Sequence, residues 1–177
     1  MSAIARYLNQ NGIKVSGYDK VSTPLTRTLD SEGIEIHYED QPSIIPRDLD
    51  MVIYTPAIPN DLMELLFLKE AGHRLYKRAE VLGLISRVKK TIGIAGTHGK
   101  TSTSTMLTYL MKEGGIDCTA FLGGISHNYK SNFIAGRSEY VVVEADEYDR
   151  SFLQLRPHMA AIMSMDPDHL DIYDNPK

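Results

Sequence analysis

A glycine-rich turn between an apolar run and a helical pattern constrains the fold of this chain more than any other feature. The apolar residues 91–95 predict a buried strand, and residues 100–113 predict a helix. Between them the chain reads Gly96-Thr97-His98-Gly99-Lys100-Thr101-Ser102. Glycines allow the backbone to turn so that successive N–H groups face phosphate oxygens, and the helix N-terminus adds a favourable dipole. We therefore expect an α/β sheet that carries a phosphate-binding loop.

Two side chains of this loop have expected roles. Lys100 would reach the β- and γ-phosphates of a nucleotide, and the Thr101 hydroxyl would coordinate Mg²⁺. The general Walker pattern has a further glycine where this chain has Ile94, so the match to it is incomplete. The alternative is a glycine-rich turn that binds nothing. For His98 two interpretations stay open, a contact made by its side chain or one made by its backbone alone.

An acidic segment follows the next apolar run. Directly after residues 140–143 stand four carboxylates, Glu144, Asp146, Glu147 and Asp149. Ligands of open α/β sheets bind at the carboxyl ends of the strands, so one of these groups is expected to face the Mg²⁺ of the phosphate loop. The alternative is a solvated acidic loop.

A histidine among aspartates follows a third apolar run. His169 stands between Asp168 and Asp171, shortly after residues 159–163. A histidine in this setting can hold a metal, with a neighbouring carboxylate orienting its ring. The alternative is a surface histidine, but the shared edge of the sheet favours a metal ligand.

Short strands and helices alternate along the first half of the chain. We expect strands at residues 13–19, 34–37 and 51–55, and helices at 1–8, 24–31, 61–71 and 78–88. Asn60 can cap the helix at 61–71, and Gly72 would end it. Parallel neighbours need crossover connections. The pattern therefore predicts an α/β fold, with a Rossmann-like domain over residues 1–88 and a P-loop-type parallel-sheet domain over residues 89–177.

Apolar spacing in the second domain predicts its buried faces. The helix at 100–113 would bury one face, made of Met106, Leu107, Leu110 and Met111. The runs 140–143 and 159–163 are typical of strands buried on both faces. Cys118 lies in an apolar stretch without an activating base beside it, so we expect a buried structural thiol.

Composition excludes several classes of function. The 177 residues include 19 basic and 23 acidic ones, for a formal net charge of -4, without the basic stripe of a nucleic-acid binder. The first residues do not form a secretory signal, and no apolar run is long enough to cross a membrane. With a single cysteine, these features predict a soluble cytoplasmic protein.

In order and context the three segments resemble the Mur ligase family. Its ATP loop is commonly Gly-Thr-Asn-Gly-Lys-Thr, and the form with His98 resembles the subgroup that adds L-alanine or a murein tripeptide to UDP-N-acetylmuramate. Residues 144–147, followed by Ser151-Phe152-Leu153, are similar to the same subgroup, and residues 168–171 match the family's Asp-His element. The resemblance implies that Thr101, Glu144 and His169 are Mg²⁺ ligands.

The resemblance also implies an activity. ATP would phosphorylate the lactyl carboxylate of UDP-N-acetylmuramate, and the amino group of L-alanine would attack the acyl phosphate, in peptidoglycan biosynthesis. ATP would bind at Gly96, Thr97, His98, Gly99, Lys100, Thr101 and Ser102, with Lys100, Glu144 and His169 as the catalytic residues. The UDP-sugar would bind in the first domain, with Asp19 at the end of its second strand.

By this resemblance the chain is a fragment. Residues 1–5 resemble the helix that follows the first glycine-rich loop, and a third domain of the family has no counterpart, so the fragment alone is expected to be inactive. Three alternatives stay open: a murein tripeptide-recycling ligase, a P-loop kinase or nucleotide switch, and a binding module without activity. The sequence does not define the oligomeric state.

Overall fold

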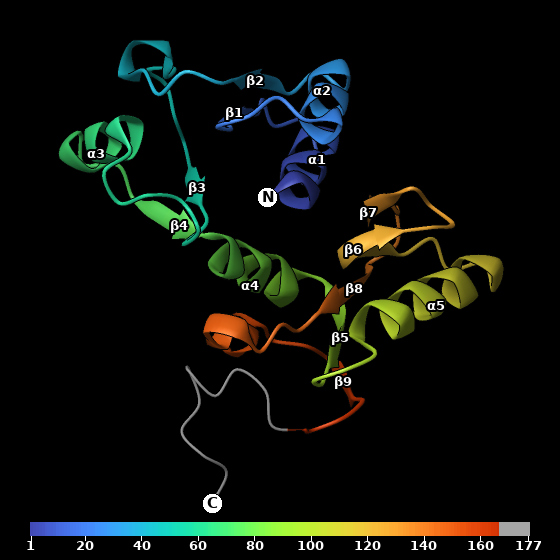
Figure 1. Cartoon of the computed structure of the whole chain (residues 1–177). Coiled ribbons are helices and arrows are strands. Elements are labelled where there is room, and N and C mark those ends of the chain that lie inside the picture. Colours follow the sequence, from blue (N-terminus) through green and yellow to red (C-terminus); the bar gives the residue numbers. More distant parts are fainter. Residues whose placement is uncertain (167–177) are drawn as a thin grey trace, which may run out of the picture. The chain divides into compact units, whose positions relative to one another are not determined.

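The computed structural model describes residues 1–166 and divides the chain into two compact units, Met1–Val81 and Leu82–Lys177. Both units are built from parallel strands and helices (Figure 1), which confirms the predicted α/β class. The expected metal ligand His169 lies outside the described residues.

The first unit contains two separate pairs of parallel strands. β1 (Ser16–Tyr18) pairs with β2 (Glu35–His37), and β3 (Val52–Tyr54) pairs with β4 (Leu75–Lys77). The helical segments are α1 (Ser2–Gln10), α2 (Pro24–Ser31), η1 (Pro42–Ile44), α3 (Met63–Glu70) and the beginning of α4 (Arg78–Val88). The predicted strands are present but shorter than expected, and β4 is a strand that the sequence pattern did not predict.

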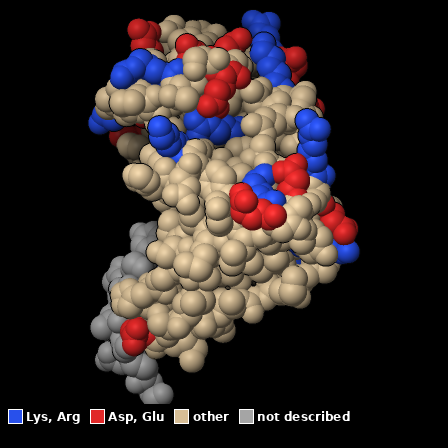
Figure 2. All heavy atoms as spheres, turned by 90° about the vertical axis from the view of Figure 1, so that its right-hand side faces the viewer, with Lys and Arg blue, Asp and Glu red and all other residues tan. Residues whose placement is uncertain are grey.

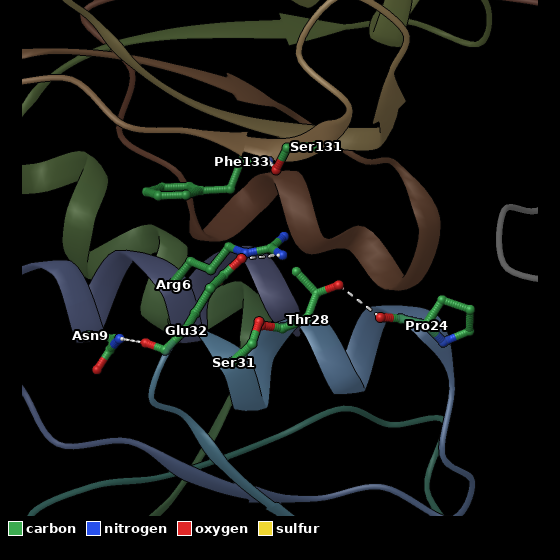
Figure 3. Close-up of polar contacts among 8 residues, drawn as sticks. All are labelled: Arg6, Asn9, Pro24, Thr28, Ser31, Glu32, Ser131 and Phe133. Carbon is green, nitrogen blue, oxygen red and sulfur yellow. Dashed lines mark hydrogen bonds and ion pairs between the residues drawn. The ribbon is translucent and has the colours of Figure 1, made fainter.

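A bidentate ion pair joins α1 to the end of α2. Arg6 donates from Nε to Glu32 Oε2 at 2.7 Å and from Nη2 to Oε1 at 2.9 Å (Figure 3). Asn9 donates to the backbone oxygen of Glu32 at 3.0 Å. Since Arg6 is 9% exposed, its charge is largely withdrawn from water, and two parallel hydrogen bonds compensate part of that cost.

The start of α3 differs from the predicted one. Its first residue is Met63, and the Asp40 carboxylate accepts hydrogen bonds from the amides of Met63 at 2.8 Å and Glu64 at 2.9 Å. The prediction that Asn60 caps this helix was therefore wrong, because the helix starts too far along the chain and a carboxylate from another loop takes that role. Gly72, with φ +79°, ends the helix as predicted.

The second unit contains a five-stranded sheet in the order β7-β6-β8-β5-β9. Its strands are β5 (Lys90–Ala95), β6 (Thr119–Ser126), β7 (Ser131–Ile134), β8 (Tyr140–Glu144) and β9 (Met159–Ile162). All neighbours are parallel except β6 and β7, an antiparallel pair that was not predicted. α5 (Lys100–Glu113) lies on one side of this sheet, and the 3₁₀ segment η2 (Tyr148–Gln154) lies on the other (Figure 1).

The core of this sheet lies between β6, β8 and α5, and the predicted buried face of α5 is only half confirmed. Leu107 and Met111 pack against the core, whereas Met106 and Leu110 are 62% and 61% exposed. The helix instead buries two hydroxyl residues, Ser104 and Thr108, both 0% exposed. Small polar residues allow α5 to approach the sheet closely, with their hydroxyls bonded inside the structure.

The two apolar strand predictions had different outcomes. Val141, Val142 and Val143 of β8 are buried, as expected of a strand in the middle of a sheet. β9 is an edge strand in the described part of the chain, and its Met159 and Ile162 are 54% and 64% exposed. The prediction that β9 is buried on both faces was therefore wrong for residues 1–166, because β5 is its only described neighbour.

The single cysteine lies in the core, as predicted. Cys118 is 0% exposed, and burial raises the pKa of its thiol.

Over residues 1–166 the structure contains no helix with the length and apolar character needed to span a bilayer. On the face that Figure 2 displays, Lys and Arg are interspersed with Asp and Glu.

Candidate nucleotide and metal site

The site lies where successive connections in the sheet of the second unit run in opposite directions across the strand order. From β5 the chain crosses through α5 towards β6, whereas from β8 it crosses through η2 towards β9 on the other side of β5. With right-handed crossovers, the two connections cover opposite faces of the sheet, and open α/β sheets bind ligands at the carboxyl ends of the strands where this happens, here β5 and β8. The phosphate loop follows β5, and the acidic segment follows β8.

The register of these strands sets the two segments at the same level. In the parallel pair β5 and β8, Ile94 is the partner of Glu144. The amide of Ala145 donates to the backbone oxygen of Ile94 at 2.9 Å. The loop after β5 therefore begins beside the carboxylate that ends β8.

Two glycines shape the backbone of the phosphate loop. Gly96 has φ +125°, and a Cβ there would lie 2.7 Å from the amide nitrogen of Ser164. Gly99 has φ +83° and stands directly before the first residue of α5. Contact and conformation together make Gly96 hard to replace, whereas at Gly99 the conformation alone disfavours other residues.

The segment after β9 binds part of this loop. The amide of Thr97 donates to the Ser164 backbone oxygen at 3.1 Å, and the amide of His98 donates to Ser164 Oγ at 2.9 Å. The His98 side chain is exposed. The first intrahelical bond of α5 runs from Thr103 to Gly99, so the amides of residues 100–102 have no partner within the helix. Those first-turn amides, with the helix dipole, are the donors that would face an anion.

Lys100 projects from the first turn of α5 back over the loop. Its ammonium group donates to the Gly96 backbone oxygen at 2.7 Å and to Glu147 Oε1 at 2.7 Å. The side chains of Lys100 and Glu147 are only 16% and 22% exposed. The positive charge is thus fixed beside the helix N-terminus, where a terminal phosphate would be bound.

Thr101 and Glu144 lie in direct contact. The Thr101 hydroxyl donates to Glu144 Oε2 at 3.0 Å, so the structure brings together two of the three predicted metal ligands. The other carboxylate oxygen of Glu144 accepts from Ser104 Oγ at 2.9 Å and from the Gly123 amide at 2.7 Å. A hydroxyl and a carboxylate are hard oxygen donors of the kind that Mg²⁺ prefers, so these residues fit the ion.

A shallow groove runs from Thr101 along α5 and β6, with a volume of about 390 Å³. Its lining includes Ser102 and Thr105 of α5, and Ser126 and His127 at the end of β6, and it contains no Asp, Glu, Lys or Arg. Ser126 is 4% exposed, and among the described residues its hydroxyl has no hydrogen-bond partner. The lining also includes Met106, Tyr109 and Ile125, so the groove presents a mixed polar and apolar surface next to the phosphate loop.

In the first unit, the predicted UDP-sugar residue Asp19 follows β1 directly. Its amide donates to the His37 backbone oxygen at 3.1 Å, and its exposed carboxylate accepts from the Val21 amide at 3.2 Å. His37, whose backbone oxygen accepts the first of these bonds, is the last residue of β2. The structure pairs its Nε2 with Glu64 Oε1 at 2.8 Å, and Glu64 is 6% exposed.

Sequence reasoning missed three contributors to the site: Ser104, Gly123 and Ser164. The spacing of Ser104 from Thr101, three residues along one helix, was a usable signal because such residues share a face. Gly123 stands in a Gly-Gly pair within an apolar run, which indicates a close approach of another group. No local signal marks Ser164, because its role depends on where β9 ends in space.

Two family models match the chain. The model described as "Mur ligase family, catalytic domain" matches residues 1–90, and the one described as "Mur ligase middle domain" matches residues 94–177. Together they cover both structural units, including the phosphate loop and the acidic segment.

Individual relatives are similar to the chain over almost its whole length. The "UDP-N-acetylmuramate--L-alanine ligase" of Cytophaga hutchinsonii is 54% identical over 99% of this chain and 40% of the relative, and that of Porphyromonas gingivalis is 51% identical over 98% and 39%. The chain thus spans about 40% of the length of these relatives.

Solved structures share the fold. The UDP-N-acetylmuramate-alanine ligase MurC from Thermotoga maritima, 30% identical, matches with a TM-score of 0.86 over 99% of this chain and 41% of its own. A murein peptide ligase from Psychrobacter arcticus, 24% identical, matches with a TM-score of 0.83 over 97% of this chain and 42% of its own. Since the family models cover residues 1–90 and 94–177, this chain belongs to the Mur ligase family.

Proposed function

We propose that the full-length protein is an ATP-dependent ligase that joins L-alanine to the lactyl carboxylate of UDP-N-acetylmuramate. This reaction is a step of peptidoglycan biosynthesis, on which the cell wall, cell shape and cell division depend. The relatives at 54% and 51% identity carry this activity in their names. We place the reaction in the cytoplasm, where ATP is available.

One contact in the site carries the proposal: the 3.0 Å hydrogen bond between Thr101 Oγ1 and Glu144 Oε2. It joins the first turn of α5 to the end of β8, beside the loop that holds Lys100. A nucleotide with its terminal phosphates at this helix N-terminus would be close to the Lys100 ammonium group and the first-turn amides. It would also be close to two oxygen ligands for Mg²⁺, from Thr101 and Glu144. That combination is what phosphoryl transfer requires.

The chain's own residues would mainly neutralise charge. Two anions, the lactyl carboxylate and the γ-phosphate, must approach each other, and the repulsion between them is the main obstacle. Lys100 would exchange its present partner Glu147 for phosphate oxygens, and the first-turn amides would hold the same group in place. Mg²⁺ bound by Thr101, Glu144 and His169 would supply further positive charge.

The reaction would take two steps. A carboxylate oxygen of the lactyl group would attack the γ-phosphorus of ATP, the bond from that phosphorus to the bridging oxygen would break, and ADP would leave. The neutral amino group of L-alanine would then attack the acyl carbon, expel inorganic phosphate and lose a proton.

We assign the two halves of the chain separate roles. Residues 1–88 would bind the UDP-sugar, with Asp19 at its site, and residues 89–177 would bind ATP and Mg²⁺. This division follows the two family matches, over residues 1–90 and 94–177. Because family membership extends over the first half as well, a P-loop kinase or nucleotide switch is no longer a competing function.

The test uses the purified full-length protein with ATP and Mg²⁺. We expect ADP formation to require both UDP-N-acetylmuramate and L-alanine, and mass spectrometry to detect the amide product. A murein tripeptide is assayed in parallel. Product formation with the tripeptide but not with L-alanine would assign the protein to peptidoglycan recycling, and ADP formation without UDP-N-acetylmuramate would contradict both ligase functions.

A further inference from the structure

The two oxygens of the Glu144 carboxylate have different surroundings. Oε1 accepts two hydrogen bonds, from Ser104 Oγ at 2.9 Å and from the Gly123 amide at 2.7 Å. Oε2 accepts from the Thr101 hydroxyl at 3.0 Å. One oxygen is therefore bound to the protein framework, and the other points to the residue that would share a cation with it.

The buried position of Ser104 gives its hydroxyl few alternative hydrogen-bond partners. It is 0% exposed, on the face of α5 that packs against the sheet, so bulk water does not compete for its hydrogen. Its one other acceptor is the Thr101 backbone oxygen, at the longer distance of 3.1 Å. A buried hydroxyl needs a hydrogen-bond acceptor, and Glu144 supplies the shorter of the two contacts.

Gly123 contributes through its amide and through the absence of a side chain. A Cβ at this position would lie 2.4 Å from Glu144 Oε2 and 3.1 Å from its Cδ. The carboxylate therefore occupies the space that a side chain would fill. At the neighbouring Gly124, a Cβ would lie 3.6 Å from the Thr101 methyl group, an ordinary contact distance.

We propose that Ser104 and Gly123 are positioning residues that fix the Glu144 carboxylate through Oε1 and leave Oε2 directed towards the cation shared with Thr101. The inference rests on the proposed role of Glu144 as a metal ligand. Hydrogen bonds from outer partners orient a ligand and strengthen metal binding, and their loss typically weakens metal affinity about 10- to 100-fold. The carboxylate itself remains in both positioning variants, so its orientation is what changes.

The experiment measures metal binding directly, without turnover. Mn²⁺ is titrated into full-length protein saturated with ADP, and electron paramagnetic resonance reports the free ion. We expect Ser104→Ala to raise the dissociation constant of Mn²⁺ about tenfold. Ser104→Thr keeps the hydroxyl and should bind Mn²⁺ as the unmodified protein does. Gly123→Ala should also weaken Mn²⁺ binding, because its methyl group displaces the carboxylate.

Two matched controls separate positioning from general damage. Thr108→Ala removes a second hydroxyl of 0% exposure from the same face of α5, one whose hydrogen bond goes to the Ser104 backbone oxygen. Gly124→Ala adds a methyl group one residue from Gly123. Both should leave Mn²⁺ binding unchanged, and all variants should bind ADP normally in the presence of EDTA.

The outcomes distinguish this inference from the proposed function. If the unmodified protein binds neither ADP nor Mn²⁺, the proposed function fails. If it binds both and Ser104→Ala binds Mn²⁺ equally well, only the positioning role fails. Equal weakening by Ser104→Ala and Ser104→Thr, or a parallel loss of ADP binding in EDTA, would also overturn that role.

Discussion

The Lys100 ammonium group lies 2.7 Å from Glu147 Oε1, so a carboxylate from the loop after β8 holds the cation of the phosphate loop. Both side chains are mostly buried, so salt screens this contact less than it screens an exposed ion pair. A polyphosphate that binds at the N-terminus of α5 would compete with Glu147 for Lys100. It would also meet the negative charge of Glu147 nearby.

This competition predicts that Glu147→Gln tightens nucleotide binding. We expect the dissociation constant of ADP, measured by calorimetry in EDTA, to fall about tenfold, equivalent to about 1.4 kcal/mol. The control is Glu139→Gln, which makes the same charge change at the exposed pair with Lys90. Weaker ADP binding in Glu147→Gln would mean that the carboxylate orients Lys100 instead of competing for it.

Removal of the Lys100 ammonium group should abolish most of the catalytic activity. In full-length protein, Lys100→Ala is expected to lower ATP turnover by a factor of about 10² to 10³, as for other groups that stabilise developing charge. Lys112→Ala removes a positive charge from the other end of α5, where Lys112 pairs with Asp117, and should keep normal turnover. Near-normal turnover of Lys100→Ala would refute the assignment of the phosphate loop.

The cap of α3 provides a stability test in the first unit. Asp40→Ala removes the acceptor of two helix amides and should lower the free energy of unfolding by about 1 kcal/mol. Asn60→Ala, at the position that the sequence pattern favoured, should leave it unchanged. Urea denaturation followed by circular dichroism measures both. A larger loss in Asn60→Ala would contradict the observed start of the helix.

The thiol of Cys118 should be unreactive in the folded protein. Burial raises its pKa, so at a given pH a smaller fraction is thiolate, and the side chain is also inaccessible. We expect slow labelling by a disulfide reagent at pH 8 and fast labelling in urea, with the modified peptide identified by mass spectrometry. Fast labelling without denaturant would place Cys118 outside the core.

Most helices and the first three strands were predictable from sequence, whereas β4, β6 and β7 were not. The helices at 24–31, 78–88 and 100–113 have the predicted bounds, since each combines helical spacing with a clear start or stop. β4 runs directly into α4 without a turn residue to mark its end, and the Gly-Gly pair in β6 interrupts its apolar pattern. β7 begins with Ser131 and Asn132, which resemble a loop.

The parts of the candidate site that lie within continuous sequence motifs were predictable. The contacts between distant segments were not. The phosphate loop and the acidic segment were recognised because each follows an apolar strand, and parallel strands end at one edge. Ser164 joins the loop amides only because β9 ends beside Gly96, a fact of three-dimensional arrangement. Half of the predicted buried face of α5 was wrong, because hydrophobic spacing does not anticipate that Ser104 and Thr108 face the sheet.

The pairing of Ile94 with Glu144 has a consequence for how this site tolerates change in length. Inserting or deleting one residue inside β8 would move the carboxylate by about 3.3 Å and turn it to the opposite face of the sheet. The same alteration after Arg150 would leave that alignment intact. Over evolution, insertions should therefore accumulate beyond the acidic segment, while the interval from Tyr140 to Glu144 keeps a constant number of residues.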